Sequence, residues 1–531
     1  MCAGARTTGG RDLPRGRSSR APAGTHGRRS AVAEREVKLG AAPTFRLPEL
    51  AGVADGVTAG PQQERRLEAT YYDTADLRLA RWGLSLRHRN VDGWTLKLPD
   101  SLDGPVLARS EVTFAGTARR PPPEALALVR AYLRGAPVER VARLSTWRRR
   151  VPLLDAGGGE LAEVVDDEVS VLSGRRVAAR FREVEVELRP GGEGLLGPVL
   201  DRLRQAGAGR ADPTPKHVRA LGPAATGPPD VAVRRLPAAP AAVDVVRNAL
   251  AAGTQLVLRH DPRVRVGGDP EDVHQMRVGT RRLRSHLRTF RPLLDREWTD
   301  SLRDELGWLA GELGVVRDAE VLLERLRELA RQLPDVDQRA VRALLRELEA
   351  SVEAGRARLL EAISSQRYYD LLERLVAAAD HPVPNPEAPE RLDAPAPAAL
   401  LPLARRPWRA LATAVRALDA HPDDDDLHRI RILAKRVRYA AEAVTPAVGG
   451  GAGRLARLAA GLQTVLGEHQ DSVVARAWLR SAARGQRRAF VAGQLSALEA
   501  GIGAAARRSW PQAWRQLARR RMRSWMAATP T

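Results

Sequence analysis

The 531-residue sequence is poor in cysteine, in aromatic residues and in long apolar runs. Its one cysteine, Cys2, excludes a disulfide framework and a cysteine-based metal site. Aromatic residues make up only 4% of the chain, which counts against recognition of single-stranded nucleic acid by base stacking. No apolar run approaches the length of a membrane span, and residues 1–30 lack the apolar segment of a secretory signal. We therefore expect a cytoplasmic protein.

Positive charge, in contrast, is abundant. The chain has 86 Lys and Arg residues against 64 Asp and Glu residues, which gives a net charge of +22. Such an excess predicts a polyanionic partner such as nucleic acid, a phosphate polymer or an anionic membrane. Residues 1–32, rich in Arg, Gly and Ser, are predicted to be a disordered basic tail. The length exceeds what one core supports, so two or three domains are expected.

One segment concentrates this charge on a single predicted helix. "VHQMRVGTRRLRSHLRTFRPLL", residues 273–294, contains two histidines and six arginines but no acid. At about 100° per residue most of its basic residues gather on one face, opposite the apolar ones. A solvated face usually mixes both signs, so an all-cationic stripe favours a bound anion. The stripe consists of His274, Arg277, Arg281, Arg284 and Arg288.

A second segment, residues 427–444, repeats the stripe at the same spacings. Downstream of the first stripe, "LGVVRDAEVL" from Leu313 recurs as "LGEHQDSVVA" from Leu466. A helix and its trailing motif have therefore been duplicated together. Within the motif, Asp318 and Asp471 are interpreted as buried partners of basic residues or as helix caps. The second stripe consists of His428, Arg431, Lys435 and Arg438.

Hydrophobic periodicity divides the chain into two unlike parts. Residues 33–221 mostly alternate with period 2 and contain glycine turns, which predicts an antiparallel sheet or barrel of about eight strands. Residues 222–239 are a Pro/Ala-rich linker. Residues 240–525 have a helical period, and a proline-rich break separates repeats at about 240–380 and 400–525. The predicted fold class is α+β and multidomain.

Charged residues recur on one face of the predicted strands. In "EREVK", Glu34, Glu36 and Lys38 point to the same side, because alternate residues of a strand share a face. Similar patterns occur in "SLRHR", "RSE" and "REVEVEL". A solvent-exposed face explains one such strand, but four in a closed sheet would line a lumen rich in both signs. Carboxylates for a divalent metal and Lys or Arg for phosphate oxygens suit the handling of a polyphosphate.

These motifs resemble those of the CYTH family, the triphosphate tunnel metalloenzymes. "EREVK" is similar to the ExExK signature, "YYDTADLRLARWGLSLRHR" to the second block, and "GWTLKLP", "RSEV", "STWRRR", "AEVVDDEV" and "REVEVEL" follow in the family's order over residues 33–221. Trp82 stands where the family usually has a small residue. The paired basic helices and "LGVVRDAEV" resemble the CHAD domain, a conserved-histidine α-helical domain, over residues 240–525.

The CYTH resemblance implies an eight-stranded tunnel that hydrolyses short-chain polyphosphate, typically triphosphate, with Mg²⁺ or Mn²⁺. The implied catalytic group is Glu34, Glu36 and Lys38. The implied metal ligands are Glu34, Glu36, Glu111, Asp166, Glu183 and Glu185. The implied substrate-binding residues are Lys38, Arg87, Arg89, Lys97, Arg148 and Lys216. Arg150 and Asp167 are rivals of Arg148 and Asp166, and Glu187 shares the face of Glu183 and Glu185.

The CHAD resemblance implies two four-helix bundles related by a pseudo-twofold axis, with the two basic helices lining a surface that binds inorganic polyphosphate. The implied polyphosphate-binding residues are His274, Arg277, Arg281, Arg284, Arg288, His428, Arg431, Lys435 and Arg438. Such a surface would also allow association with polyphosphate granules.

The sequence leaves several functions open. The leading interpretation is an inorganic triphosphatase with an appended polyphosphate-binding module. Hydrolysis of an organic triphosphate (thiamine triphosphate or a nucleotide), or cyclisation of ATP as in an adenylate cyclase, would use the same tunnel. A non-catalytic scaffold would only grip the polyphosphate. We expect no specific nucleic-acid partner and no membrane partner.

Overall fold

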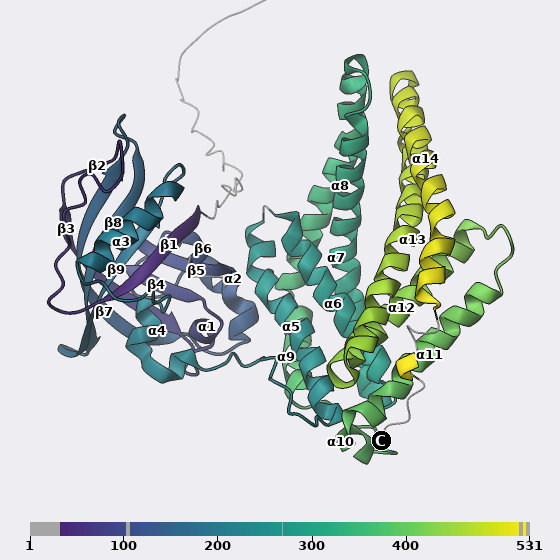
Figure 1. The fold of residues 1–531 in the computed structure, drawn as a ribbon, viewed down its shortest axis with the longest axis horizontal. Helices are drawn as coiled ribbons and strands as arrows, with labels where there is room; N and C mark the ends of the chain where they lie inside the picture. The colour runs from purple at the N-terminus through teal and green to yellow at the C-terminus, as the bar shows by residue number, and fades with distance from the viewer. Residues whose placement is uncertain (1–31, 102–106, 268, 520–523, 527–531) are drawn as a thin grey trace, which may run out of the picture.

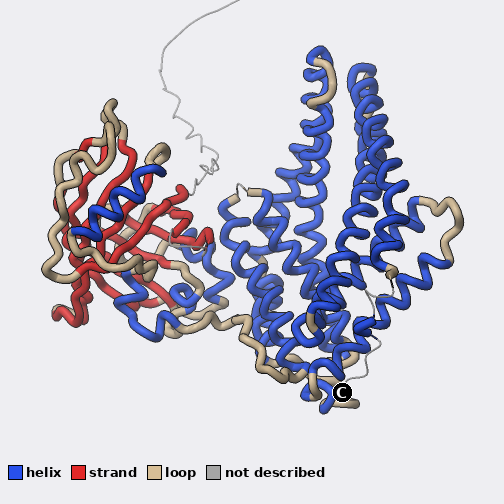
Figure 2. The backbone as a smooth tube through the Cα atoms, in the orientation of Figure 1, coloured by secondary structure: helices blue, strands red, loops and turns tan. Residues whose placement is uncertain are grey.

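The computed structural model describes residues 32–101, 107–267, 269–519 and 524–526. The predicted basic tail, residues 1–32, lies outside these residues except for Val32. A strand-rich part is followed by an all-helical part beside it (Figure 1, Figure 2). The predicted α+β, multidomain fold class is confirmed.

The strand-rich part is an antiparallel barrel. Eight strands pair in the order β7-β3-β4-β5-β6-β1-β9-β8, and the pairing of β8 with β7 closes the circle. A short additional strand, β2, pairs with the end of β7. The strands are β1 (Val32–Ala41), β2 (Thr58–Ala59), β3 (Gln63–Asp73), β4 (Ser85–Arg89), β5 (Gly93–Ser101), β6 (Leu107–Phe114), β7 (Glu139–Leu154), β8 (Glu160–Ser173) and β9 (Arg176–Leu188).

Helices cover the outside of the barrel. α3 (Leu196–Gln205) packs Val199 and Leu203 against the outward side chains of β8 and β9, among them Val164. α2 (Pro123–Leu133) belongs to a second core with the outward residues of β4 and β5. Two short helices, α1 (Arg78–Arg81) and α4 (Lys216–Leu221), complete the domain. Because alternate strand residues bind these helices, the other half of each strand is left to line the lumen.

The all-helical part contains four long helices from each repeat, α5–α8 and α11–α14. They are α5 (Ala242–Val266), α6 (Pro270–Phe290), α7 (Arg296–Ala330), α8 (Gln338–Ser364), α11 (Ala396–Arg416), α12 (Asp424–Val448), α13 (Gly450–Ala482) and α14 (Gln486–Leu517), with α9 (Gln366–Asp380) and α10 (Glu390–Asp393) between the repeats. The helices α5–α8 share one continuous apolar core with α2 and the outward residues of β4 and β5, and α11–α14 form a core of their own. A third core joins α7 and α8 to α13 and α14, the two arms in Figure 1.

The two basic helices begin in the same way. The Asp269 carboxylate accepts a hydrogen bond from the Glu271 backbone N–H at the start of α6. Asp423 accepts one from the Asp426 N–H at the start of α12. Acidic residues at a helix N-terminus are favourable because the macrodipole is positive there. In each helix the acidic residues are therefore concentrated in the first turn, and the basic stripe follows them along the helix.

α14 is a described helix that has the length and apolar composition of a membrane span. Its most apolar window has a mean hydropathy of 1.3 and is 28% buried, so the sequence expectation that no run approaches this length is too strict. Fully buried Glu499 of α14 accepts hydrogen bonds of 2.6 and 2.8 Å from Arg325 of α7. A single such helix is weak evidence for a membrane span, and this ion pair ties it to the opposite arm.

The barrel and the helical part meet through α2 and the predicted linker. The Arg130 guanidinium of α2 lies 4.0 Å from the ring centre of Tyr369 in α9. Trp82, buried beside the linker, donates a hydrogen bond of 2.8 Å to Asp230. Val231 is only 1% exposed. The linker is therefore packed between the domains, and the unusual Trp82 is one of its anchors.

Candidate functional site

The charged residues on the inner face of the barrel come together as the alternation predicts. Along β1 and β9, Lys38 is opposite Glu185 and Glu36 is opposite Glu187. On the other side of β9, Glu187 is opposite Glu163 of β8. Three neighbouring strands therefore bring carboxylates to the same level of the lumen.

Lys38 is held by the acids of its own strand and of β9. Its Nζ atom lies 3.0 Å from Glu36 Oε2 and 4.0 Å from Glu183 Oε1, and it donates a hydrogen bond to Glu185. Burial opposes its charge, but attraction to Glu185 and Glu36 raises the pKa of Lys38 above its usual value. Lys38 is therefore a permanent cation in the tunnel.

Lys216 reaches the same acids from α4. Its Nζ atom lies 2.6 Å from Glu183 Oε1 and 2.8 Å from Glu185 Oε1. Burial opposes ionisation of Glu185, but Lys216, Lys38 and Arg148 outweigh it and hold the pKa of Glu185 well below its usual range. For the fully buried Glu183, burial dominates and raises the pKa. Neighbouring carboxylates of one strand thus differ in acidity.

One predicted metal ligand points out of the tunnel. The Asp166 carboxylate accepts hydrogen bonds of 2.8 and 2.7 Å from Arg182, on the outer side of the sheet. Its rival Asp167 faces the lumen, where Arg148 donates to it at 2.8 and 2.6 Å and Lys216 lies 2.9 Å away. Adjacent strand residues face opposite ways, so Asp167 and not Asp166 lies on the inner side of the sheet, contrary to the choice made from the sequence. A metal role for either residue stays a prediction.

The opposite wall of the tunnel comes from β4, β5 and β6. Lys97 Nζ lies 2.9 Å from Glu111 Oε2, and Arg87 Nη2 lies 3.7 Å from Glu111 Oε1. Arg89 donates a hydrogen bond of 2.6 Å to Asp92 at the end of β4. The structure therefore brings these four predicted residues, Arg87, Arg89, Lys97 and Glu111, to one face of the lumen.

Glu34 lies in β1 with its backbone opposite Arg109 of β6. Its side chain is outside the described part of the structure, so its predicted metal role stays a prediction. Arg150, the rival of Arg148, pairs with Glu160 at 2.6 Å and with Glu163. Arg148 lines the cavity and Arg150 does not, and the predicted role of Arg148 in substrate binding stays a prediction.

Several lumen residues were missed by the sequence analysis. Glu163 and Arg189 lie in the tunnel 3.5 Å apart, and Glu163 shares the inward face of Asp167 four residues later. The four-residue spacing between Glu163 and Asp167 could have identified Glu163 as an inward-facing residue from the sequence. Tyr71, opposite Arg87 in β3, stacks on His217 with ring centres 5.0 Å apart. Burial opposes ionisation of Tyr71, but Arg87 and other nearby cations lower its pKa.

Together these side chains enclose a cavity of about 240 Å³. It is lined by Glu36, Lys38, Tyr71, Ser85, Arg87, Arg89, Asp92, Lys97, Glu111, Arg148, Glu163, Glu185, Glu187, Arg189, Pro215, Lys216 and His217. Its walls are almost entirely polar, and seven cations alternate with six carboxylates. A cavity of this kind is suited to a small, highly charged anion and is unsuited to an apolar ligand.

The donor set of this cavity fits a hard divalent cation. Glu36, Glu111, Glu163, Glu185 and Glu187 offer carboxylate oxygens, the ligands that Mg²⁺ and Mn²⁺ prefer. In the part of the chain that the structure describes, no three acids or histidines are assembled as a metal site. The acids point instead toward Lys and Arg partners, as with Lys38 between Glu36 and Glu185. An incoming cation and an anionic substrate would exchange these internal pairs for new ones.

The two basic helices of the helical part face each other. Burial and then the charge of Arg436 in α12 lower the pKa of Arg288 in α6. Arg281 likewise lies near Tyr439 and Arg438 of α12. The two duplicated stripes thus form one continuous cationic surface across the boundary between the repeats.

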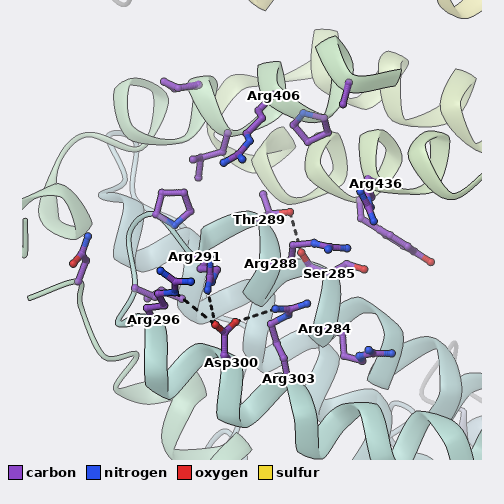
Figure 3. A pocket seen from close by; sticks show the side chains of 18 of the residues that line it. Arg284, Ser285, Arg288, Thr289, Arg291, Arg296, Asp300, Arg303, Arg406 and Arg436 are labelled. Carbon is purple, nitrogen blue, oxygen red and sulfur yellow. Dashed lines mark hydrogen bonds and ion pairs between the residues drawn. The ribbon is translucent and has the colours of Figure 1, made fainter. Parts of the chain in front are cut away.

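A large groove of about 1040 Å³ occupies one end of this surface (Figure 3). Eight arginines and a lysine line it, against three acids. These cations are Arg281, Arg284, Arg288, Arg291, Arg296, Arg303, Arg406, Lys435 and Arg436. Five of them were not predicted, because four lie outside the duplicated stripe and Arg436 is offset from it; the other four are Arg291, Arg296, Arg303 and Arg406.

Asp300 of α7 organises the lower edge of the groove. Its carboxylate contacts Arg291 at 2.5 Å, Arg303 at 3.0 Å and Arg296 at 4.0 Å (Figure 3). Arg406 of α11 approaches from the opposite wall in the same view. One acid thus holds three guanidinium groups toward a shared space, which is a suitable arrangement for phosphate oxygens.

The remaining predicted stripe residues lie beyond this groove. Arg277 pairs with Asp318 at 2.6 Å, although the Asp318 side chain is 71% exposed and so is not the buried partner that was expected. His428 hydrogen-bonds to Gln470 at 2.8 Å. Burial and nearby Arg317 lower the pKa of His274.

The glycine of each repeated motif lies beside an arginine of the preceding basic helix. Arg277 lies against Gly314 of the first motif, and Arg431 lies against Gly467 of the second. Asp471 of the second motif corresponds to Asp318 of the first. Burial raises the pKa of Asp471, and the charge of Arg431 partly offsets this increase. The motif therefore supports the basic helix that precedes it.

Comparison with known proteins agrees with this architecture. The CYTH domain family matches residues 33–197, and the CHAD domain family matches residues 248–480. The chain therefore belongs to the proteins in which a CYTH domain, the triphosphate tunnel type, is joined to a CHAD domain.

Two relatives from Mycobacterium tuberculosis match most of this chain. "Uncharacterized protein Rv2226" (strain H37Rv) and "Uncharacterized protein MT2285" (strain CDC 1551) are each 36% identical over 454 residues, which is 81% of this chain and 84% of the relative. Among solved structures, PptA from Streptomyces chartreusis is 28% identical with a TM-score of 0.44, over 52% of this chain and 99% of that one. The CHAD domain from the plant Ricinus communis is 28% identical with a TM-score of 0.40, over 56% of this chain and 96% of that one.

Proposed function

We propose that the tunnel hydrolyses inorganic triphosphate or short-chain polyphosphate with Mg²⁺ or Mn²⁺, and that the helical part binds inorganic polyphosphate. The observation that carries the first half is the cavity of about 240 Å³ in which cations and carboxylates alternate. Its small volume and polar walls favour a bare phosphate chain over a substrate with a large apolar group.

The cations of the tunnel would bind and orient the substrate. Arg87, Arg89 and Lys97 line one wall, and Arg148 and Lys216 line the other. Their charges would neutralise the phosphate oxygens and hold the chain along the tunnel, which also stabilises charge during phosphoryl transfer. Water attacks a terminal phosphorus atom and releases a proton to solvent, the bond to the bridging oxygen breaks, and the rest of the chain (pyrophosphate when the substrate is triphosphate) leaves with that oxygen and the electron pair.

The carboxylates would hold the divalent cation. Glu36, Glu111 and Glu185 are the predicted ligands whose described side chains line the cavity, and Glu163 adds a further oxygen donor. When bound, the cation supplies charge neutralisation at the phosphates and lowers the pKa of water. Glu185, whose pKa is well below its usual range, is ready to accept such a cation at any neutral pH.

The groove between α6 and α12 supports the second half of the proposal. Its eight arginines and one lysine face only three acids, and the excess charge would be neutralised by an extended polyanion. A phosphate chain fits better than duplex DNA because the groove is concave and is enclosed by four helices, α6, α7, α11 and α12. The proposal places the chain in the cytoplasm, on polyphosphate granules where these form.

A substrate panel tests both halves. Phosphate release is measured from pyrophosphate, inorganic triphosphate, ATP, thiamine triphosphate and long-chain polyphosphate, each with Mg²⁺ or Mn²⁺. We expect release from triphosphate to exceed release from the organic triphosphates. Preference for ATP or thiamine triphosphate would favour the organic-triphosphate function. Binding of long-chain polyphosphate without release from any substrate would favour a scaffold.

A further inference from the structure

Lys435 differs from its partner in the duplicated stripe. The position that matches it in the first repeat is Arg281, and both side chains line the groove. A guanidinium stays charged at any physiological pH, whereas a buried amine can lose its proton. Within the described residues no carboxylate forms an ion pair with Lys435, and its partly buried side chain ends among other cations.

Cations approach Lys435 from several sides. From α6 it faces Arg277, Arg281 and Arg284, and from its own helix Arg431. Arg406 of α11 lines the opposite wall of the same groove. On α13, Asp471 interacts with Arg431 and Arg325. A proton on Lys435 would therefore add one more positive charge to a crowded, unneutralised group.

We propose that polyphosphate binding to the groove is coupled to uptake of a proton by Lys435. The groove then holds the phosphate chain more tightly as the pH falls through the neutral range. This inference rests on the proposed polyphosphate function and adds its regulation. The proton comes from solvent and converts a neutral amine into an ammonium ion, with no other bond made or broken.

The electrostatics of the free protein support this coupling. Burial, followed by repulsion from Arg281 and Arg431, lowers the pKa of Lys435 to about 7. At pH 8 about nine-tenths of the free protein would then have a neutral lysine. A bound phosphate chain reverses the local field, so the pKa of Lys435 rises toward its ordinary value. Because the bound state holds more protons, lower pH favours binding.

Titration calorimetry with long-chain inorganic polyphosphate tests the coupling in the full-length protein. Binding at pH 8.0 is measured in two buffers of different ionisation enthalpy, and the difference in heat gives the number of protons taken up. Wild type is compared with Lys435→Arg, which keeps the positive charge but cannot titrate. The terminal phosphates and the histidines titrate in both proteins, so the difference between them isolates Lys435.

We expect wild type to take up about 0.9 proton more than Lys435→Arg, as the lysine pKa of about 7 requires. Its affinity should fall by up to about tenfold per pH unit above pH 7.5, and that of the variant should change much less. Equal proton uptake by the two proteins would overturn the coupling alone. Absence of binding by wild type would overturn the polyphosphate function as well.

The thermal midpoint gives an independent readout. Without polyphosphate at pH 8, Lys435→Arg should melt at a lower temperature than wild type, because its groove carries an additional permanent charge. Saturating polyphosphate should raise its midpoint more than that of wild type. An unchanged midpoint without ligand would mean that Lys435 is already charged in the free protein, which contradicts the coupling.

Discussion

The Asp167 carboxylate accepts two hydrogen bonds from Arg148, at 2.8 and 2.6 Å, inside the tunnel, and its neighbour Asp166 faces Arg182 outside. Asp167→Asn should therefore lower kcat/KM for triphosphate by about 10²-fold, because Arg148 and Lys216 lose the acid that positions them. Asp166→Asn should mainly lower stability, by about 1–3 kcal/mol, since it weakens a buried ion pair. Steady-state kinetics and urea unfolding of both variants measure these effects. A large loss of kcat/KM in Asp166→Asn, with only a loss of stability in Asp167→Asn, would show that Asp166 is the functional residue.

Glu163 was not anticipated, and its place in the lumen predicts a role in metal use. Glu163→Gln should raise the concentration of Mg²⁺ or Mn²⁺ needed for half-maximal activity by about tenfold, because a carboxylate is replaced by a weaker neutral donor. Glu168, on the exposed side of β8 beside Arg149, offers a matched control. Metal titrations that leave the two variants equal would remove Glu163 from the site.

The groove predicts a strong dependence of polyphosphate binding on salt. Binding should weaken steeply as the salt concentration rises, because each neutralised phosphate releases a counterion. Arg284→Ala should lower affinity and reduce the slope of log K against log salt by about one. Arg176→Ala, at the exposed start of β9, should change neither. Isotherms at three or more salt concentrations measure the slope, and a slope unchanged by Arg284→Ala would place the phosphate chain elsewhere.

Because His286 is buried, the protein should lose stability in mild acid. It is buried in α6 with Nδ1–H donating to the Ala249 carbonyl at 3.2 Å, and burial lowers its pKa to about 4. Its folded pKa lies below the unfolded value near 6.5, so stability is complete above pH 6.5 and falls as the pH drops toward 4. The loss should reach about 3 kcal/mol. Urea unfolding across this range should show a smaller decline for His286→Phe.

The contact of Trp82 with the linker suggests that the two domains stabilise each other. Trp82→Ala should remove its hydrogen bond to Asp230 and its edge contact with Tyr132, at a cost of about 3 kcal/mol. Differential scanning calorimetry should then show the barrel unfolding separately from the helices. Trp147, which is 42% exposed, provides the control, and its replacement by Ala should cost much less. Coincident unfolding in Trp82→Ala would assign the coupling to other contacts.

The sequence was sufficient where a repeating pattern determines geometry. Strand alternation placed Lys38, Glu185 and Arg148 in one lumen, and helical spacing placed Arg281 and Lys435 on facing helices. It was insufficient where two adjacent residues had the same chemistry, because the register that separates Asp166 from Asp167 is set by pairing with β7 and β9. The Asp300 cluster could not be predicted either, since it depends on how α6 packs against α7.

The interface between the domains was also beyond the sequence. The linker composition suggested a spacer, but Val231 is buried and Asp230 binds Trp82. These contacts depend on the approach of α2 to α5 and α9, which no local pattern encodes. Trp82 departs from the family pattern at this interface, but its sequence position alone did not indicate that it contacts the linker.

We propose that the tunnel is a metal-dependent active site, and one measurement tests this directly. Phosphate release from inorganic triphosphate should be measured with Mg²⁺, with Mn²⁺ and with a chelator, for wild type, Glu36→Gln and the control Glu64→Gln on the outer side of β3. We predict metal-dependent release by wild type and Glu64→Gln that falls at least about 10²-fold in Glu36→Gln while polyphosphate binding persists. Equal release by wild type and Glu36→Gln, or release that a chelator does not affect, would show that the tunnel is not a metal-dependent active site.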